Sequence, residues 1–169
     1  MLKTLRQIAR IGNVSQNPPT PAADSPAALH AAIWQILGRA LCLRLVDAAS
    51  CNACELELSA LGNPYYNLEG HGIRFVASPR HADVLLVTGP IGTNMVAAVK
   101  RTWDAMPDPK RLVAVGDCAA CGGVFGRSYA ALGALSEVLP VDLTIPGCPP
   151  SPTAVLRGLL AVAARNVAG

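Results

Sequence analysis

Cysteine is the residue type in this chain whose spacing points to chemistry. Five of the six cysteines stand in three short segments: Cys51-Asn-Ala-Cys54-Glu-Leu-Glu57, Gly116-Asp-Cys118-Ala-Ala-Cys121-Gly-Gly123 and Pro146-Gly-Cys148-Pro-Pro150. Thiolates are the usual ligands of iron–sulfur clusters, which commonly take four of them. We therefore expect folding to bring four of these sulfurs together around one cluster.

The residues around these cysteines suit a bulky inorganic group. The Cys51-x-x-Cys54 spacing lets one loop supply two ligands to the same cluster. A glycine lets main-chain N–H groups approach the sulfurs closely, which tunes the reduction potential. A proline directly after a cysteine, as at Cys148-Pro149, also occurs in ferredoxin-type sites. The glycines beside the other candidates are Gly116, Gly122, Gly123 and Gly147.

Two other kinds of site compete with a cluster. A thioredoxin-like dithiol would explain the first pair but leaves Cys118 and Cys148 without a role. A structural zinc ion also takes four thiolates, although such sites usually pair two close C-x-x-C knuckles. Because Cys118-x-x-Cys121 would serve as a second knuckle, zinc remains an alternative. Cys121 is therefore either a bystander or a fifth candidate for four positions, and Cys42 is expected to be a buried free thiol.

The elements that position these segments alternate between strands and helices. Strands are expected over 41–46, 73–77, 84–88, 112–115 and 141–145, and helices over 54–61, 93–105, 128–137 and 152–165. Such alternation predicts an α/β fold, with an open parallel sheet covered by helices on both faces. Sites in these sheets lie beyond the carboxyl ends of the strands. We expect each cysteine segment to be a loop that follows a strand, so all three fall on that edge.

The chain before the sheet divides into distinct parts. Residues 1–12 predict an amphipathic helix, with Lys3, Arg6 and Arg10 on one face. It docks either on a membrane surface or membrane-embedded partner, or on its own domain, and both interpretations stay open. Residues 13–26 are a proline-rich arm, and a helix is expected over 27–40. The predicted division is therefore a segment 1–26 and a single α/β cluster-binding domain, 27–169.

Composition limits the classes of function. The chain has 169 residues, 51% hydrophobic and only 15% charged, so we expect much of its surface to be covered by partners. No stretch is long and apolar enough for a transmembrane helix. A net charge of +3 gives no support for nucleic-acid binding. The N-terminus lacks a signal-peptide pattern and a twin-arginine pair, so we expect a cytosolic chain whose cysteines serve metal or redox chemistry.

The segment from about 41 to 165 resembles a known family. It is similar to the small, cluster-bearing subunit shared by respiratory complex I (its 20 kDa subunit) and the membrane-bound, energy-converting (group 4) [NiFe] hydrogenases, formate hydrogenlyase included. Besides the first cysteine segment, the matching stretches are Ser78-Pro-Arg80-His-Ala-Asp83-Val-Leu, Met106-Pro-Asp-Pro-Lys110, Gly116-Asp-Cys118, Gly122-Gly-Val-Phe125, Pro140-Val-Asp142 and Pro146-Gly-Cys-Pro-Pro150.

This resemblance implies a flavodoxin-like fold that holds one [4Fe-4S] cluster. The implied ligands are Cys51, Cys54, Cys118 and Cys148, with Cys121 as the alternate. Complex I subunits carry two adjacent cysteines first, whereas hydrogenase subunits carry C-x-x-C and an acidic residue, as here. The chain departs from the hydrogenase pattern at Ala53, where glycine is usual, and at the extra Cys121. No cysteine follows Cys148, so one cluster is the expected limit.

The resemblance also implies a role and partners. The chain would relay electrons between the active site of a [NiFe]-hydrogenase-type large subunit and ferredoxin-like subunits, without a complete active site of its own. It would lie peripherally on the cytoplasmic side of the inner membrane, beside membrane-embedded subunits. Glu55 and Glu57 would contact the large subunit or assist proton movement, or be solvated carboxylates at a helix start. Two alternatives are a complex I-type subunit that passes electrons to quinone, with Arg80 and His81 near the quinone cavity, and a zinc-stabilised scaffold.

Overall fold

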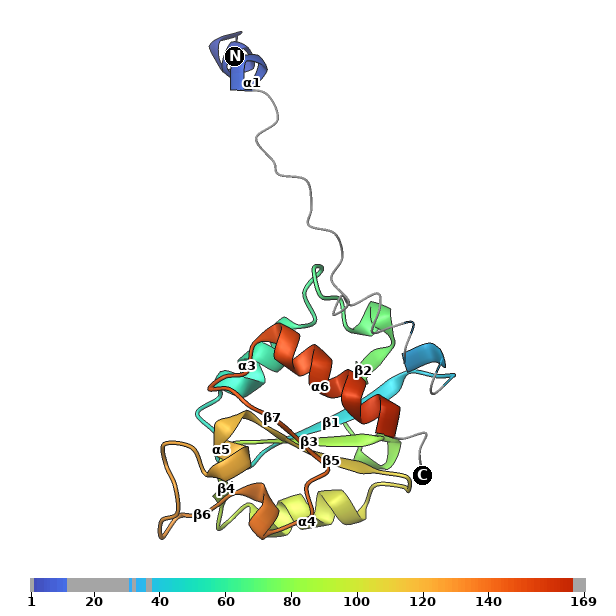
Figure 1. The fold of residues 1–169 in the computed structure, drawn as a ribbon, viewed down its shortest axis with the longest axis vertical. Helices are drawn as coiled ribbons and strands as arrows, with labels where there is room; N and C mark the ends of the chain where they lie inside the picture. Colours follow the sequence, from blue (N-terminus) through green and yellow to red (C-terminus); the bar gives the residue numbers. More distant parts are fainter. Residues whose placement is uncertain (1, 12–30, 32, 36–37, 166–169) are drawn as a thin grey trace.

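A parallel sheet forms the centre of the protein, which we describe from a computed structural model (Figure 1). The structure describes residues 2–11, 31, 33–35 and 38–165. Helix α1 (Leu2–Ile11) forms where the periodicity predicts it. Residues 31 and 33–35 are helical, as expected, whereas residues 38–40 are not, and Gly38 has a positive φ of 62° that ends the helix earlier than predicted. The predicted arm and residues 27–30, 32 and 36–37 lie outside the described residues.

The sheet has five parallel strands in the order β2-β1-β3-β5-β7. This order reverses direction between β1 and β3, which is the flavodoxin-like arrangement. The central β3 reads Val-Leu-Leu-Val-Thr and is buried along its whole length, as expected for a strand covered on both faces. The strands are β1 (Leu41–Asp47), β2 (Ile73–Phe75), β3 (Val84–Thr88), β5 (Arg111–Val115) and β7 (Leu143–Ile145).

Helices cover both faces of the sheet, as the alternation predicts. Helices α3 (Ala53–Ala60) and α6 (Pro152–Arg165) lie on one face, and α4 (Val96–Asp104) lies on the other (Figure 1). Alternate strand residues therefore feed two separate cores. Leu43, Leu86 and Val113 pack with α3 and α6, while Leu85, Val87 and Leu112 pack towards α4. Among the described helices, none has the length and apolar content to cross a membrane.

Two local predictions are wrong. The second cysteine segment is a short helix, α5 (Gly116–Cys121), rather than a loop; it ends where Gly122 takes a positive φ of 88°. The helix predicted over 128–137 is absent: β6 (Ala131–Gly133) pairs antiparallel with β4 (Ile91–Gly92), and a 3₁₀ turn, η3 (Leu135–Glu137), follows. Gly133 has a φ of 107°, a conformation that a right-handed helix cannot contain.

Candidate cluster site

The three cysteine segments meet at one edge of the sheet. Cys51 follows β1, Cys118 follows β5, and Cys148 follows β7. Because these strands are parallel, their carboxyl ends lie at the same edge, as the sequence predicts. The structure therefore brings together all of the predicted ligand segments, although the second carries its cysteines on a helix.

A tight turn sets the directions of the first two cysteines. The Asp47 carboxylate accepts hydrogen bonds from the N–H groups of Ala49 and Ser50, at 2.9 and 2.7 Å. Asn52 then has a φ of 70° and precedes the first residue of α3. The result is that Cys51 stays exposed in the turn, whereas Cys54 is buried in the first turn of the helix, 8% exposed.

Glycine backbone packs directly against the two buried sulfurs. Gly116 has a φ of 85°, and a Cβ atom there would lie 2.7 Å from the Sγ atom of Cys54. Gly123 has a φ of 55°, and its Cβ atom would lie 2.7 Å from the Sγ atom of Cys118. Both positions exclude a side chain by conformation and by contact. The glycines thus form the close-fitting backbone that the sequence predicts around a cluster.

Asp117 joins the second segment to the third. Its Oδ1 atom accepts a hydrogen bond from the Gly147 N–H at 2.8 Å, and its own N–H donates to the Gly147 carbonyl oxygen at 2.9 Å. This reciprocal pair fixes the distance between the turns that carry Cys118 and Cys148. The sequence showed Asp117 as a family-like residue, but its pairing with Gly147 depends on contacts between distant segments.

The four predicted ligands influence one another electrostatically. Burial, the nearby Glu55 carboxylate and the thiols of Cys118, Cys51 and Cys148 raise the pKa of Cys54 to about 11. Burial is also the largest cause that raises the pKa of Cys118, and the thiols of Cys148 and Cys51 raise it further. Thiolates gathered in this way need a positive centre to stay ionised together. The donor set therefore fits a metal group, with two ligands buried and two exposed.

The fifth thiol in these segments points elsewhere. The exposed Cys121 donates from its Sγ atom to the Asp117 carbonyl oxygen at 3.2 Å, one helical turn back. Cys118, on the same short helix, is buried at 8% exposure and faces the glycine backbone. Cys118 acts electrostatically on the Cys54 thiol together with Cys51 and Cys148, whereas Cys121 does not, which favours Cys118 over Cys121 as the ligand. Cys42, at the opposite end of β1, is only partly buried, not fully buried as expected.

The described residues show no preformed site for a single metal ion. Within the described ranges, no three Cys, His, Asp or Glu side chains converge closely enough to hold one metal ion. A cubane cluster binds each thiolate through a different iron atom, so its ligands need not converge in that way.

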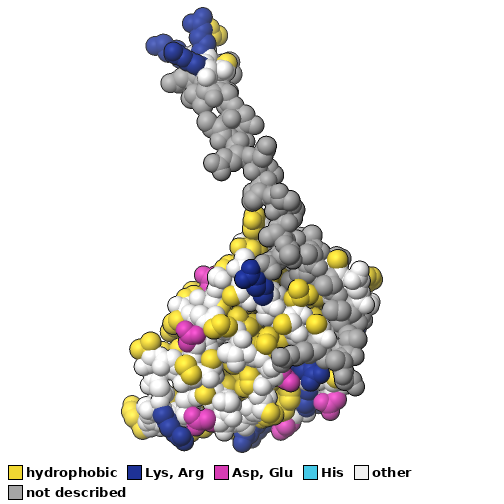
Figure 2. All heavy atoms as spheres, in the orientation of Figure 1, with side chains coloured by type: hydrophobic (Ala, Val, Ile, Leu, Met, Phe, Trp, Pro, Cys, Tyr) yellow, Lys and Arg dark blue, Asp and Glu magenta, His cyan; other side chains and the backbone are white. Residues whose placement is uncertain are grey.

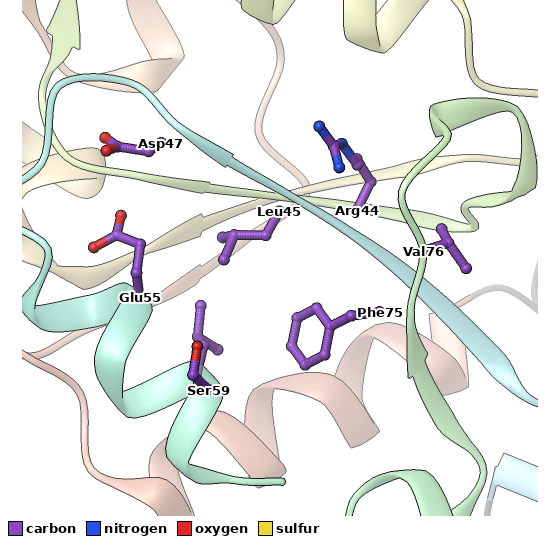
Figure 3. Close-up of a pocket in the computed structure, with 8 residues that line it drawn as sticks. Arg44, Leu45, Asp47, Glu55, Ser59, Phe75 and Val76 are labelled. Atoms are coloured by element: carbon purple, nitrogen blue, oxygen red, sulfur yellow. The ribbon is translucent and has the colours of Figure 1, made fainter.

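The two predicted acidic residues have different environments. Both carboxylate oxygens of Glu55 are buried and have no hydrogen-bond partner among the described residues. Glu55 also lines a pocket of about 420 Å³ with Arg44, Leu45, Asp47, Leu58, Ser59, Phe75 and Val76 (Figure 3). Glu57 is half-buried on the same helix. Arg80 and His81 are exposed in a 3₁₀ turn, η2 (Pro79–His81), after β2.

The comparisons with known proteins decide the family. Residues 51–162 match the family described as "NADH ubiquinone oxidoreductase, 20 Kd subunit". The chain belongs to this family. The match covers all three cysteine segments and the strands β2, β3, β5 and β7, but not β1. Its members are subunits of oxidoreductases related to complex I.

Relatives from hydrogenase complexes lie within the same family. The chain is 39% identical over 140 residues to formate hydrogenlyase subunit 7 of Escherichia coli, covering 83% of this chain and 55% of that protein. It thus spans little more than half of that relative. It is 41% identical over 130 residues to a probable membrane-bound hydrogenase subunit of Pyrococcus furiosus, covering 77% and 78% of the two chains.

Solved structures agree with this placement. A chain of the membrane-bound sulfane sulfur reductase, an archaeal respiratory membrane complex, matches with a TM-score of 0.68 and 31% identity, covering 83% of this chain and 77% of that chain. An NAD⁺-reducing [NiFe]-hydrogenase matches with a TM-score of 0.57 and 20% identity, over 73% of this chain and 93% of that one. The second match supports the α/β fold alone.

Proposed function

We propose that this chain is the electron-transfer subunit of a membrane-associated [NiFe]-hydrogenase-type complex. One [4Fe-4S] cluster would be held by Cys51, Cys54, Cys118 and Cys148. The observation that carries the proposal is the meeting of these thiols at one sheet edge, with glycine backbone against both buried sulfurs. When bound, the cluster would take up and release single electrons.

The exposed side of the site suits a covering subunit. Cys51 and Cys148 are exposed, and the loop after α5 presents Val124, Phe125 and Tyr129, which are 91%, 58% and 98% exposed. Figure 2 shows further hydrophobic side chains spread over one face of the domain, with few charges between them. Large exposed apolar residues mark interaction surfaces. A hydrogenase-type large subunit would cover this edge and exchange electrons with the cluster.

The remaining partners belong to the same proposal and rest on the family resemblance of the sequence. Formate hydrogenlyase and membrane-bound hydrogenase are the complexes named for the two hydrogenase relatives. On the family resemblance, a ferredoxin-like subunit would exchange electrons on the other side of the cluster. The chain would lie peripherally on the cytoplasmic side of the inner membrane, against membrane-embedded subunits.

A quinone-reducing role is the second candidate. It is favoured by the family description, which names an NADH ubiquinone oxidoreductase subunit. Against it, the first predicted ligand pair is Cys51-x-x-Cys54, the hydrogenase form, and the relatives at 39% and 41% identity described above are named as formate hydrogenlyase and membrane-bound hydrogenase subunits. The sequence of the partner large subunit separates the two roles, because two C-x-x-C pairs there would indicate a nickel centre.

Metal analysis tests the cluster itself. The anaerobically purified complex should contain iron and acid-labile sulfide assignable to this chain, with an EPR signal on reduction at low temperature. Stoichiometric zinc without sulfide would instead support the scaffold alternative.

A pair of serine variants tests the ligand choice. Cys118→Ser should abolish the signal of this cluster, since it removes a buried ligand against Gly123. Cys121→Ser should keep the signal and the iron content, because its exposed thiol only donates to a backbone carbonyl one turn back. The opposite pattern would assign the ligand to Cys121.

A further inference from the structure

The pocket beside α3 contains a charge that the described chain does not neutralise. Both Oε atoms of Glu55 are shielded from solvent and have no hydrogen-bond partner among the described residues. A buried carboxylate without a partner costs several kcal/mol, and such groups are normally paired. The position of Glu55 is therefore suited to a partner group that comes from outside the described chain.

The geometry around Glu55 indicates what that group is. Figure 3 shows the carboxyl groups of Glu55 and Asp47 pointing to the same end of the pocket, while Leu45 and Phe75 form its wall. Arg44 also lines the pocket, but it leaves β1 on the face opposite to Leu45 (Figure 3). No ion pair joins Arg44 to Glu55 within the described residues, and the Arg44 Nε atom itself has no partner there.

We infer that the pocket receives a lysine or arginine side chain from a neighbouring subunit, which pairs with Glu55. Two carboxylates at one end attract a cation, and the apolar wall suits the aliphatic stem of a long cationic side chain. The volume of about 420 Å³ is ample for one such side chain. The rim of the pocket is suited to docking, because Phe75, which lines it, is 38% exposed.

This inference rests on the proposed function in one respect, since the neighbour is taken to be a subunit of the same complex. It selects Glu55, rather than Glu57, as the acidic contact of α3. It also assigns the contact to the β2 edge of the sheet, where β2 ends at Phe75 and pairs only with the first part of β1.

The first test measures assembly of the whole complex through a tag on the large subunit. Glu55→Gln should weaken the apparent affinity of this chain for the complex by roughly thirtyfold, as expected when a buried charge pair is broken. Less of this chain should therefore be retained through a salt wash. Glu69→Gln is the matched control, because Glu69 is an exposed acid in the 3₁₀ turn η1 (Glu69–His71). Equal retention of the two variants would overturn the inference.

The second test keeps Glu55 and maps the occupant. Benzoylphenylalanine in place of Phe75 should cross-link, in the complex, to a segment of another subunit that contains a lysine or arginine. Changing that cation to glutamate should weaken assembly, and combining it with Glu55→Lys should restore it. A cross-link within this chain, to lipid, or to a segment without a cation would overturn the inference, as would no cross-link.

The failure of this inference is distinguishable from failure of the proposed function. Iron, sulfide and the EPR signal of the same samples report on the cluster, whereas retention and cross-linking report on the pocket. A chain that holds its cluster but shows equal retention for Glu55→Gln and Glu69→Gln loses the docking site alone. A chain without a cluster whose Glu55 still pairs with a subunit loses the electron-relay role alone.

Discussion

Substitution of Gly116 by alanine tests the close packing at the site most directly. The substitution has two costs. A φ of 85° is unfavourable for alanine by about 1–2 kcal/mol. The new Cβ atom would also lie 2.7 Å from the Cys54 Sγ atom and 3.3 Å from the Gly147 carbonyl oxygen, and such overpacking costs about 1–3 kcal/mol. Together, Gly116→Ala should lower the free energy of unfolding by roughly 2–5 kcal/mol.

Gly126 offers a matched control in the same region. It has a φ of 57°, yet no heavy atom lies within 4 Å of the Cβ position. Gly126→Ala therefore carries the conformational cost without the contact, about 1–2 kcal/mol. The difference between the two variants isolates the displacement of the Cys54 sulfur.

The assay is urea unfolding of the full-length, cluster-free chain under reducing conditions, followed by reconstitution and measurement of iron per chain. Gly116→Ala should lose more stability than Gly126→Ala and should also hold less iron, because the displaced Sγ atom belongs to a predicted ligand. If the two variants retain equal iron and unfold at equal urea concentrations, then Gly116 does not pack against a ligand sulfur and the geometry argued for the site is wrong.

Two further measurements examine the same site. Asp117→Ala should cost about 1–3 kcal/mol in urea unfolding, because it leaves the Gly147 N–H without its 2.8 Å partner, whereas the exposed Asp104→Ala should be nearly neutral. If the two variants have equal urea midpoints, the hydrogen bond between Asp117 and Gly147 does not contribute to stability. In the cluster-free chain, the pKa of Cys54 is raised from 9.0 to about 11, so the unfolded chain loses this proton first as pH rises. Stability should therefore fall between pH 9 and 11, and alkylation of Cys54 should accelerate only as pH approaches 11; rapid alkylation of Cys54 at pH 9 would contradict the assignment.

The sheet and the placement of the cysteine segments could be predicted from the sequence because the signals are local. Each strand of the core reads as a short apolar run, and each cysteine segment stands directly behind one. Parallel strands then place all three segments at one edge without further information. The final helix was also predictable, since Pro152 opens it and Val155, Leu159 and Val162 recur at helical spacing and are buried.

The details that failed depend on contacts between distant segments. The predicted helix over 128–137 gives way to a strand because Gly133 turns the chain and Ala131 pairs with Gly92, far back in the sequence. In the same way, no sequence pattern distinguishes Glu55 from Glu57. Their difference arises because Glu55 faces β1 and β2 across a pocket, and those strands are brought to it only by the fold.

The central strand β3 is not followed by a cysteine segment, but its end supports the shape of the first cysteine segment. β3 lies between β1 and β5, and its Thr88 carbonyl oxygen accepts a hydrogen bond from the Ala48 N–H at 3.0 Å. At Gly89, with a φ of 76°, a Cβ atom would lie 2.5 Å from the Ser50 backbone nitrogen. The end of β3 thus packs on the turn that leads to Cys51. Because the strand order puts β3 beside β1, the end of β3 supports this turn and restricts its movement. The support is needed because Ala49 and Asn52 in the turn have positive φ angles. Rigidity of this kind is what a two-ligand loop needs, because a cluster tolerates little displacement between sulfurs on the same turn.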